Sequence, residues 1–267
     1  MRTTVLRARL SLILTALVVA GAAPYSAAAQ QAPVPAAPHA AVTVILAHGV
    51  KSASMFGAGE LTPVDPGTTF VETDLPYAVL KTTSLAPKAV VTLRVTDPQG
   101  TAYAVDVKTP AHRGDQPWQK FDFAAPIFIL GTPLEAETGT WRFDVLLDGA
   151  PAGNATFQWM RATAAELPKI KAAVDQAPQN ADLHWRYGAA LALFGRISDA
   201  ITELQRAMFL DPNYALYPIT LGRVYAQQGR GEEAAQQFQK ALALHGSMFD
   251  SVFAAWAHAG LSSLPSH

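Results

Sequence analysis

Residues 181–214 read ADLHWRYGAALALFGRISDAITELQRAMFLDPNY, and the pattern of this stretch returns at a shift of 34 residues. Gly188 matches Gly222 and Gly195 matches Gly229 (222 minus 188 and 229 minus 195 both give 34). Each copy holds a helix-length run, a Gly-Arg break and a second run that contains two alanines seven positions apart. Repeats of this length mark supersecondary units that bury their apolar faces only by stacking. The stretch therefore predicts an array of helical hairpins, which is typical of a binding scaffold.

The two copies, 181–214 and 215–248, resemble tetratricopeptide repeats. The structural positions that carry the resemblance are Gly188, Ala200, Ala207 and Pro212 in the first copy and Gly222, Tyr225, Ala234 and Ala241 in the second. Small residues let the two helices of a hairpin approach closely, and large residues fill the space between them. Proline and glycine near the ends stop the helices. The resemblance implies an α-helical repeat fold.

The array extends beyond both copies. Residues 164–176 are expected to form the second helix of a preceding unit, and residues 249–260 one further helix. Glu166 stands where the next unit has Ala200, and Trp256 is the counterpart of Gly222, so each terminal unit is expected to be incomplete. We expect six helices within residues 162–262, followed by a C-terminal tail, 263–267.

Residues 42–161 follow a different pattern, in which short runs of β-branched and aromatic residues are separated by turn-forming clusters. Apolar residues alternate in 91–95 and in 141–145. The Asp-Pro-Gln-Gly turn at 97–100 predicts a hairpin, and the apolar run 126–130 is predicted as a further strand. The pattern predicts an antiparallel β-sandwich, immunoglobulin-like in outline. The expected fold class is thus a β-sandwich domain followed by the α-helical array.

Residues 1–29 have the character of a signal peptide: a basic start, an apolar core at 10–23 and a closing run of alanines that predicts cleavage before Gln30. The core is shorter than the about 20 apolar residues that a comfortable bilayer span requires. We therefore expect export to the periplasm or the medium with no stable membrane anchor after cleavage; an uncleaved anchor is the alternative. Residues 30–41, rich in proline and alanine, are expected to be a linker.

Composition and motifs argue against several functions. The chain has no cysteine, which excludes disulfides, zinc–thiolate sites and cysteine nucleophiles. Its formal charge of −1 becomes −4 once three arginines leave with the signal peptide, which disfavours a nucleic-acid partner. No glycine-rich phosphate loop, G-x-S-x-G elbow or H-E-x-x-H helix is present. We therefore predict no catalytic, metal or cofactor site, and a protein that is not an enzyme.

The resemblance implies that the first helix of each unit lines a concave surface that binds a protein or peptide. Carried over by position, this surface consists of Asp182, Trp185, Ala189, Ala192 and Leu193 in the first unit and Leu216, Ile219, Arg223, Ala226 and Gln227 in the second. The family's carboxylate-clamp version has Lys and Asn on this face, so a receptor for chaperone tails is disfavoured. Arg223 is expected to serve binding and not folding. Two alternatives stay open: an open groove, or packing of Trp185 and Ile219 against the sandwich.

Two functions are compatible with these features. The first is an exported, non-catalytic adaptor whose helical array holds a protein or peptide of unknown identity. The second is a carbohydrate or cell-wall binding module that uses sandwich aromatics such as Tyr103, Trp118 and Trp141. Trp141 shares a face with Phe143 and Val145, which indicates a core position. The sequence therefore favours the adaptor.

Overall fold

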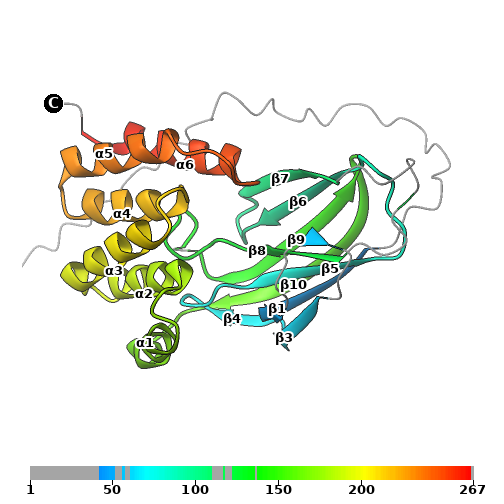
Figure 1. The fold of residues 1–267 in the computed structure, drawn as a ribbon, viewed down its shortest axis with the longest axis horizontal. Coiled ribbons are helices and arrows are strands. Elements are labelled where there is room, and N and C mark those ends of the chain that lie inside the picture. Colours follow the sequence, from blue (N-terminus) through cyan, green and yellow to red (C-terminus); the bar gives the residue numbers. More distant parts are fainter. Residues whose placement is uncertain are drawn as a thin grey trace, which may run out of the picture. The chain divides into compact units, whose positions relative to one another are not determined.

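The structure is a computed structural model, and its described residues are 42–51, 56–57, 61–109, 117, 122–135 and 137–265. Within them, two β-sheets are followed by six α-helices (Figure 1). The predicted signal peptide and linker, and the last two residues of the predicted tail, lie outside the described part.

The first sheet has the strand order β2-β8-β5-β1-β3. Its strands are β1 (Val42–Lys51), β2 (Phe56–Gly57), β3 (Thr62–Pro66), β5 (Tyr77–Thr82) and β8 (Asp122–Pro126). All neighbouring strands run antiparallel, and Leu46 of β1 lies opposite Ala78 of β5. The sequence pattern did not predict β3, whose residues Thr62 to Pro66 are half-buried or exposed and show no apolar alternation.

The second sheet has the order β4-β10-β9-β6-β7. Its strands are β4 (Thr69–Val71), β6 (Val90–Thr96), β7 (Ala102–Lys108), β9 (Gly139–Leu147) and β10 (Ala150–Met160). Among the pairings of these described strands, only β4 with β10 is parallel. The predicted hairpin is confirmed: β6 pairs with β7, and Asp97 Oδ1 accepts the N–H groups of Gln99 (2.9 Å) and Thr101 (2.7 Å) in the connecting turn.

Alternation along the strands builds the core of this β-rich region. In β9, Trp141, Phe143 and Val145 are at most 1% exposed, while the residues between them reach towards solvent. Leu80 of β5 and Phe123 of β8 belong to the same buried cluster, so both sheets contribute to one core. Side chains at every second position share a face of a strand, which is why the alternation in the sequence identified the inward residues.

The apolar run 126–130 was predicted as a strand, and this prediction is wrong beyond Pro126, where β8 ends. The Ile127 N–H still donates to Pro76 O (2.8 Å), but the Phe128 N–H donates to the Tyr103 hydroxyl (3.1 Å) and the chain leaves the sheet. Each of residues 127–130 is at most 3% exposed. The run is apolar because it is buried on all sides, which gives the same composition as a buried strand.

The C-terminal part contains the predicted six helices. After a short 3₁₀ turn, η2 (Ala164–Glu166), they are α1 (Leu167–Gln176), α2 (Ala181–Leu193), α3 (Ile197–Leu210), α4 (Leu216–Gln227), α5 (Gly231–Leu242) and α6 (Asp250–Ser263). Figure 1 shows them stacked in chain order. The first 34-residue copy forms the pair α2/α3 and the second forms α4/α5.

The repeated Gly-Arg break ends α2 and α4 in the same way. Gly195 and Gly229 have φ values of 76° and 70°, in the left-handed region that favours glycine. The next N–H groups turn back into the helix: Arg196 donates to Leu191 O (2.8 Å) and Arg230 to Tyr225 O (3.0 Å). These bonds satisfy carbonyl groups that a helix end otherwise leaves open. The break is thus a helix-ending turn repeated at a fixed interval.

The connection between β10 and η2 is short and fixed by a buried carboxylate. Glu72, which is 3% exposed, accepts hydrogen bonds from Arg161 Nη1 (3.2 Å) and from the Ala162 N–H (3.0 Å). A buried carboxylate is tolerated when charged and neutral donors satisfy it. The junction therefore has a defined path from sheet to helix.

Candidate functional site

The eight structural positions of the repeat lie mainly at the seams between paired helices. Pro212, in the turn after α3, is exposed, and the remaining seven are buried: Gly188, Ala200, Ala207, Gly222, Tyr225, Ala234 and Ala241. A Cβ atom on Gly188 would lie 2.8 Å from Leu204 Cγ and 3.1 Å from Ala200 O. One on Gly222 would lie 2.8 Å from the Phe238 ring. Both glycines therefore mark close approach of one helix to its partner.

The ten residues predicted to bind a partner lie on α2 and α4, and we call them the first-helix face. Its central members are inaccessible: Trp185, Ala189, Leu216 and Ile219 are each at most 2% exposed. Trp185 packs edge-on against Phe128, with ring centroids 6.1 Å apart, so it contacts the β-rich part of the chain. The sequence left open whether Trp185 lines an open groove or packs against the sandwich. In the structure it packs against the β-rich part. These four residues are not available to an external partner.

A segment of the chain itself covers the centre of this face. Residues 127–135, which we call the bridging segment, connect β8 towards β9 and are largely buried. The Thr220 hydroxyl donates to Gly131 O (3.2 Å) or to Leu216 O (3.0 Å), and it accepts from Trp185 Nε1 (2.9 Å). A Cβ on Gly131, whose φ is 71°, would lie 2.8 Å from Thr220 Cγ2. Glycine thus allows the segment's backbone to touch α4.

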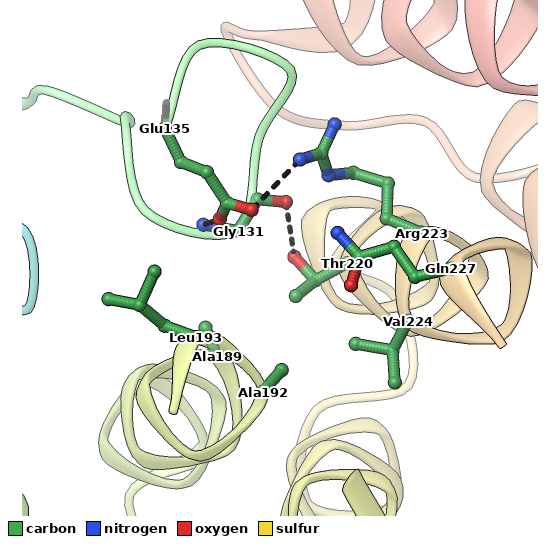
Figure 2. Close-up of a pocket in the computed structure, with 9 residues that line it drawn as sticks. All are labelled: Gly131, Glu135, Ala189, Ala192, Leu193, Thr220, Arg223, Val224 and Gln227. Atoms are coloured by element: carbon green, nitrogen blue, oxygen red, sulfur yellow. Dashed lines mark hydrogen bonds and ion pairs between the residues drawn. The ribbon is translucent and has the colours of Figure 1, made fainter. Parts of the chain in front are cut away.

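An ion pair fixes the end of the bridging segment. Arg223 Nη2 lies 3.1 Å from Glu135 Oε1, and Glu135 Oε2 accepts the Gly131 N–H at 2.8 Å (Figure 2). The two side chains are only 23% and 20% exposed, which strengthens their attraction relative to a surface pair. Arg223 was expected to serve binding and not folding; in the structure this side chain pairs with another part of the same chain.

A hollow of about 200 Å³ remains beside this ion pair, and we call it the Arg223 hollow. Figure 2 shows Leu193, Ala192 and Gln227 around it, together with Arg223 and Glu135. Ala192, Leu193, Arg223 and Ala226 are half-buried and Gln227 is exposed. The C-terminal halves of α2 and α4 thus keep an accessible part of the first-helix face.

The other open part of the face is at the N-terminal ends of α2 and α4. Asp182, in the first turn of α2, is solvent-accessible, and its Oδ1 accepts a hydrogen bond from the Tyr217 hydroxyl (2.8 Å). Desolvation by the surrounding atoms raises the pKa of Asp182, although the Tyr217 hydrogen bond opposes this rise; nearby Asp211 adds to it. The bridging segment therefore separates an acidic, aromatic end of the face from an end that carries Arg223.

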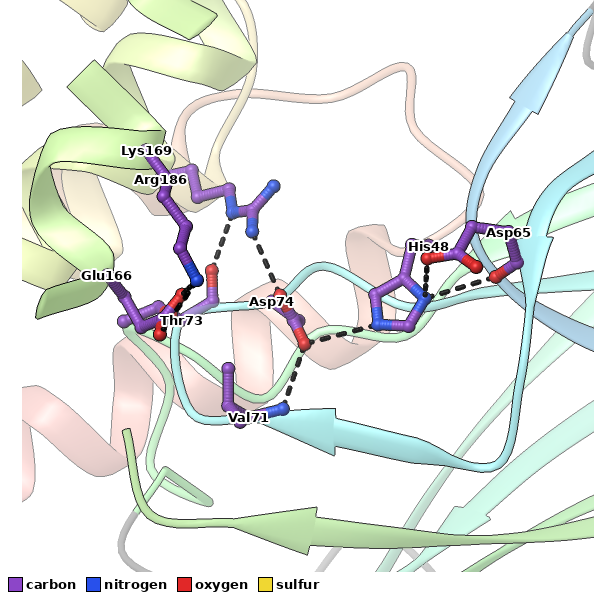
Figure 3. A network of polar contacts seen from close by, with 8 residues as sticks. All are labelled: His48, Asp65, Val71, Thr73, Asp74, Glu166, Lys169 and Arg186. Carbon is purple, nitrogen blue, oxygen red and sulfur yellow. Dashed lines mark hydrogen bonds and ion pairs between the residues drawn. The ribbon is translucent and has the colours of Figure 1, made fainter. Parts of the chain in front are cut away.

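A second set of polar contacts joins α2 to the β-rich part. Arg186 donates to Thr73 O (2.5 Å) and to Asp74 Oδ1 (3.1 Å), while Asp74 Oδ2 accepts the Val71 N–H (2.8 Å; Figure 3). His48 Nε2 lies 3.5 Å from the same Asp74 oxygen. Desolvation lowers the pKa of Arg186, and the Asp74 carboxylate counteracts this. Arg186 therefore binds the loop between β4 and β5 through both of these hydrogen bonds.

The aromatics of the alternative carbohydrate site are poorly placed for it. Trp141 is 0% exposed and donates its indole N–H to Glu137 O (3.0 Å), and Tyr103 is 9% exposed. Stacking on a sugar requires an accessible ring face, which neither residue offers. Trp118 lies outside the described residues.

The described part of the chain has neither a cluster of metal-binding side chains nor a helix that could span a membrane. There, no group of three or more His, Asp or Glu side chains comes together as a metal ion would require. His184 is buried and bonded, with Nδ1 2.6 Å from Glu203 Oε2 and Nε2 3.0 Å from Pro178 O. Among the helices that the structure describes, none is long and apolar enough to cross a bilayer.

The sequence did not identify the bridging segment, Thr220 or Glu135 as part of the site. The available signal was the run Ile127-Phe128-Ile129-Leu130, which lacks alternation and is followed by Gly131. Such a run indicates burial on every side. It does not indicate which distant surface buries it.

No protein-family model matches the chain, and no curated protein matches it. Among solved structures, a MamA protein is 24% identical over 37% of this chain and 54% of that chain, with a TM-score of 0.30. The Arabidopsis OM64 TPR domain is 20% identical over 35% of this chain and 78% of that chain, with a TM-score of 0.30. An immunoglobulin-like protein from Pseudomonas aeruginosa is 15% identical over 45% of this chain and 95% of that chain, with a TM-score of 0.27.

The match with the MamA protein thus spans about half of that protein's length. Likenesses of this size establish no family for the chain.

Proposed function

We propose that this protein is an exported, non-catalytic scaffold that binds a protein or peptide through a tetratricopeptide-repeat array, supported by an immunoglobulin-like sandwich. Three features support the repeat assignment: the 34-residue interval, the identical helix-ending turns at Gly195 and Gly229, and the close seams at Gly188 and Gly222. Two mainly antiparallel sheets around a common core support the sandwich assignment. The character of residues 1–29 supports export.

The observation that carries the proposal is the binding of the bridging segment to the first-helix face. An irregular stretch of polypeptide lies on α2 and α4 through a backbone acceptor, Gly131 O, and a side-chain ion pair, Glu135 with Arg223. A face that recognises a polypeptide within its own chain has the chemistry to recognise another one. The partner would contact the accessible remainder of the face, at Ala192, Leu193 and Gln227.

Site-specific photo-crosslinking in the native host tests this proposal. A benzoylphenylalanine at Gln227 lies at the Arg223 hollow, and one at Gln205 lies on the exposed side of α3 as a matched control. We expect a discrete adduct with one partner from position 227 and none from position 205. Equal adduct patterns from both positions, or none from 227, would contradict the proposed surface.

N-terminal sequencing of the protein from the cell envelope or the medium tests export separately. We expect the mature chain to begin at Gln30. A chain that retains Met1 and stays in the cytoplasm would contradict it.

A further inference from the structure

A second hollow lies at the acidic end of the first-helix face. It has a volume of about 230 Å³ and opens between the β-rich part and the first turns of α2 and α4. Four aromatic residues line it, Tyr77, Phe128, Tyr214 and Tyr217, and its polar groups include Asp182 and Asp211. We call it the tyrosine hollow.

The tyrosine hollow is the middle of a longer groove. A hollow of about 450 Å³ shares Tyr77 and Asp182 with it on one side. On the other side, a hollow of about 410 Å³ shares Pro126, Asp211 and Tyr214 with it. A ligand group in the tyrosine hollow therefore has room on both sides for the chain to which it is attached.

The aromatic rings form a corner. Tyr214 and Tyr217 have ring centroids 5.2 Å apart and an interplanar angle of 68°, and Phe128 lies 6.4 Å from Tyr214. An aromatic face carries partial negative charge and attracts a cation within about 6 Å of its centroid. Tyr217 and Phe128 are 1% and 3% exposed, so of these three rings the half-buried Tyr214 is the one that a cation in the hollow can reach.

Two carboxylates add full negative charge to this corner. Asp182 Oδ1 accepts from the Tyr217 hydroxyl at 2.8 Å, and Asp211 Oδ1 accepts the Asn213 N–H at 3.2 Å. Within the described residues neither carboxylate forms an ion pair, and Arg186, which lines the adjacent hollow, is held by Asp74 and Thr73 O. Burial raises the pKa of Tyr77 to about 12, with Asp182 adding to the rise and Arg186 opposing it, so this phenol stays neutral at physiological pH. The corner is thus negative and has no cation of its own among these residues.

We propose that the tyrosine hollow binds an organic cation, an ammonium or guanidinium group, with Asp182 and Asp211 as counter-ions and the half-buried ring of Tyr214 as a wall. The group can come from a lysine or arginine side chain of a partner or from a free amine. This inference rests on the proposed function, because it names the chemistry that one open end of the first-helix face recognises.

Calorimetric titration of the mature chain tests the inference with defined probes. The probes are the capped peptide acetyl-Gly-Lys-Gly-amide, the same peptide with norleucine in place of lysine, and free butylamine. We expect saturable binding of the lysine peptide and none of the norleucine peptide, because only the former carries the charge. Tighter binding of the peptide than of butylamine assigns the site to side chains, and the reverse order assigns it to free amines.

Variants locate the binding in the hollow. Asp182→Asn keeps the shape and the acceptor for Tyr217 while removing the charge, and should weaken binding about tenfold, as the loss of one charge-assisted contact does. Asp211→Asn should act in the same direction. The matched control is Asp199→Asn, an exposed carboxylate on α3 paired with Arg196, and it should leave the affinity unchanged. Thermal melts of each variant verify folding.

Three results would overturn the inference: no binding of any cationic probe, equal binding of the norleucine peptide, or affinity that is insensitive to both Asp182→Asn and Asp211→Asn. Failure here is distinguishable from failure of the proposed function. Adducts at Gln227 without amine binding remove only the cation site, whereas amine binding without adducts removes only the partner surface at the Arg223 hollow.

Discussion

The two helical pairs α2/α3 and α4/α5 share their seams and differ on the face that meets the β-rich part. Gly188 and Gly222, 34 residues apart, occupy equivalent close approaches. On the first-helix face, Trp185 corresponds to Ile219 and Ala189 to Arg223 at the same shift. The seam repeats because helix pairing imposes the same geometry on each unit. The face diverges because each unit contacts a different part of the chain.

The arginines illustrate this divergence. Arg186 of α2 reaches the loop between β4 and β5, whereas Arg223 of α4 reaches Glu135 in the bridging segment. They do not occupy equivalent repeat positions, since the counterpart of Arg186 is Thr220. The two helical pairs therefore contact the β-rich part through different residues, although their helix–helix seams are equivalent.

The largest effect should come from removing Trp185, which has no aromatic equivalent in the second pair. Trp185→Ala should lower the free energy of unfolding by about 3–5 kcal/mol, because it leaves a cavity against Phe128 and removes a donor to Thr220. Chemical denaturation measures the loss. Phe209→Ala, at a position 75% exposed, is the control and should change stability by less than about 0.5 kcal/mol. Equal losses would mean that the first pair is not docked through Trp185.

The contrast between seam and face also explains what the sequence could predict. Seams and helix-ending turns depend on contacts within a 34-residue unit, so Gly188, Ala200 and the Gly-Arg break identified them. The bridging segment depends on contacts such as Thr220 with Gly131, 89 residues apart. Nothing in the periodicity of residues 127–130 specifies a partner that far away. Trp185 was predicted as a partner-binding residue, but it packs against Phe128 of this same segment, a contact that the sequence does not specify.

The seams themselves differ in what fills them, and a double-mutant cycle can resolve this. Gly188→Leu and Gly222→Leu should each cost about 1–3 kcal/mol through overpacking. A Cβ at 188 meets the Leu204 side chain and also backbone atoms of Ala200 and Leu204, whereas the nearest atoms to a Cβ at 222 all belong to the Phe238 ring. Phe238→Ala should therefore recover part of the loss caused by Gly222→Leu and none of that caused by Gly188→Leu. Equal recovery in urea titrations would contradict this difference between the seams.

A smaller effect is expected from the Arg223–Glu135 pair. Arg223→Ala should lower the free energy of unfolding by about 1 kcal/mol, because it leaves a half-buried carboxylate without its cation. In a cycle with Glu135→Gln the two losses should not add. The control is Arg196→Ala, whose pair with Asp199 is about half exposed and should contribute little. Additive losses would show that this contact does not hold the bridging segment.

The smallest expected effect is a dependence of stability on pH that comes from Asp182 of the first pair. Its counterpart in the second pair is Leu216, which does not titrate. Desolvation raises the pKa of Asp182 in the folded state above its value in the unfolded chain. For an acid shifted in this direction, the stabilising contribution is present below the unfolded pKa and is lost as pH rises through the folded pKa. Asp182→Asn removes the cost of ionisation and keeps an acceptor for Tyr217. The variant should be more stable than the natural chain at pH 7, and its advantage should shrink as the pH falls towards the acid range. An advantage that stays constant with pH in parallel melts would show that ionisation of Asp182 does not oppose folding.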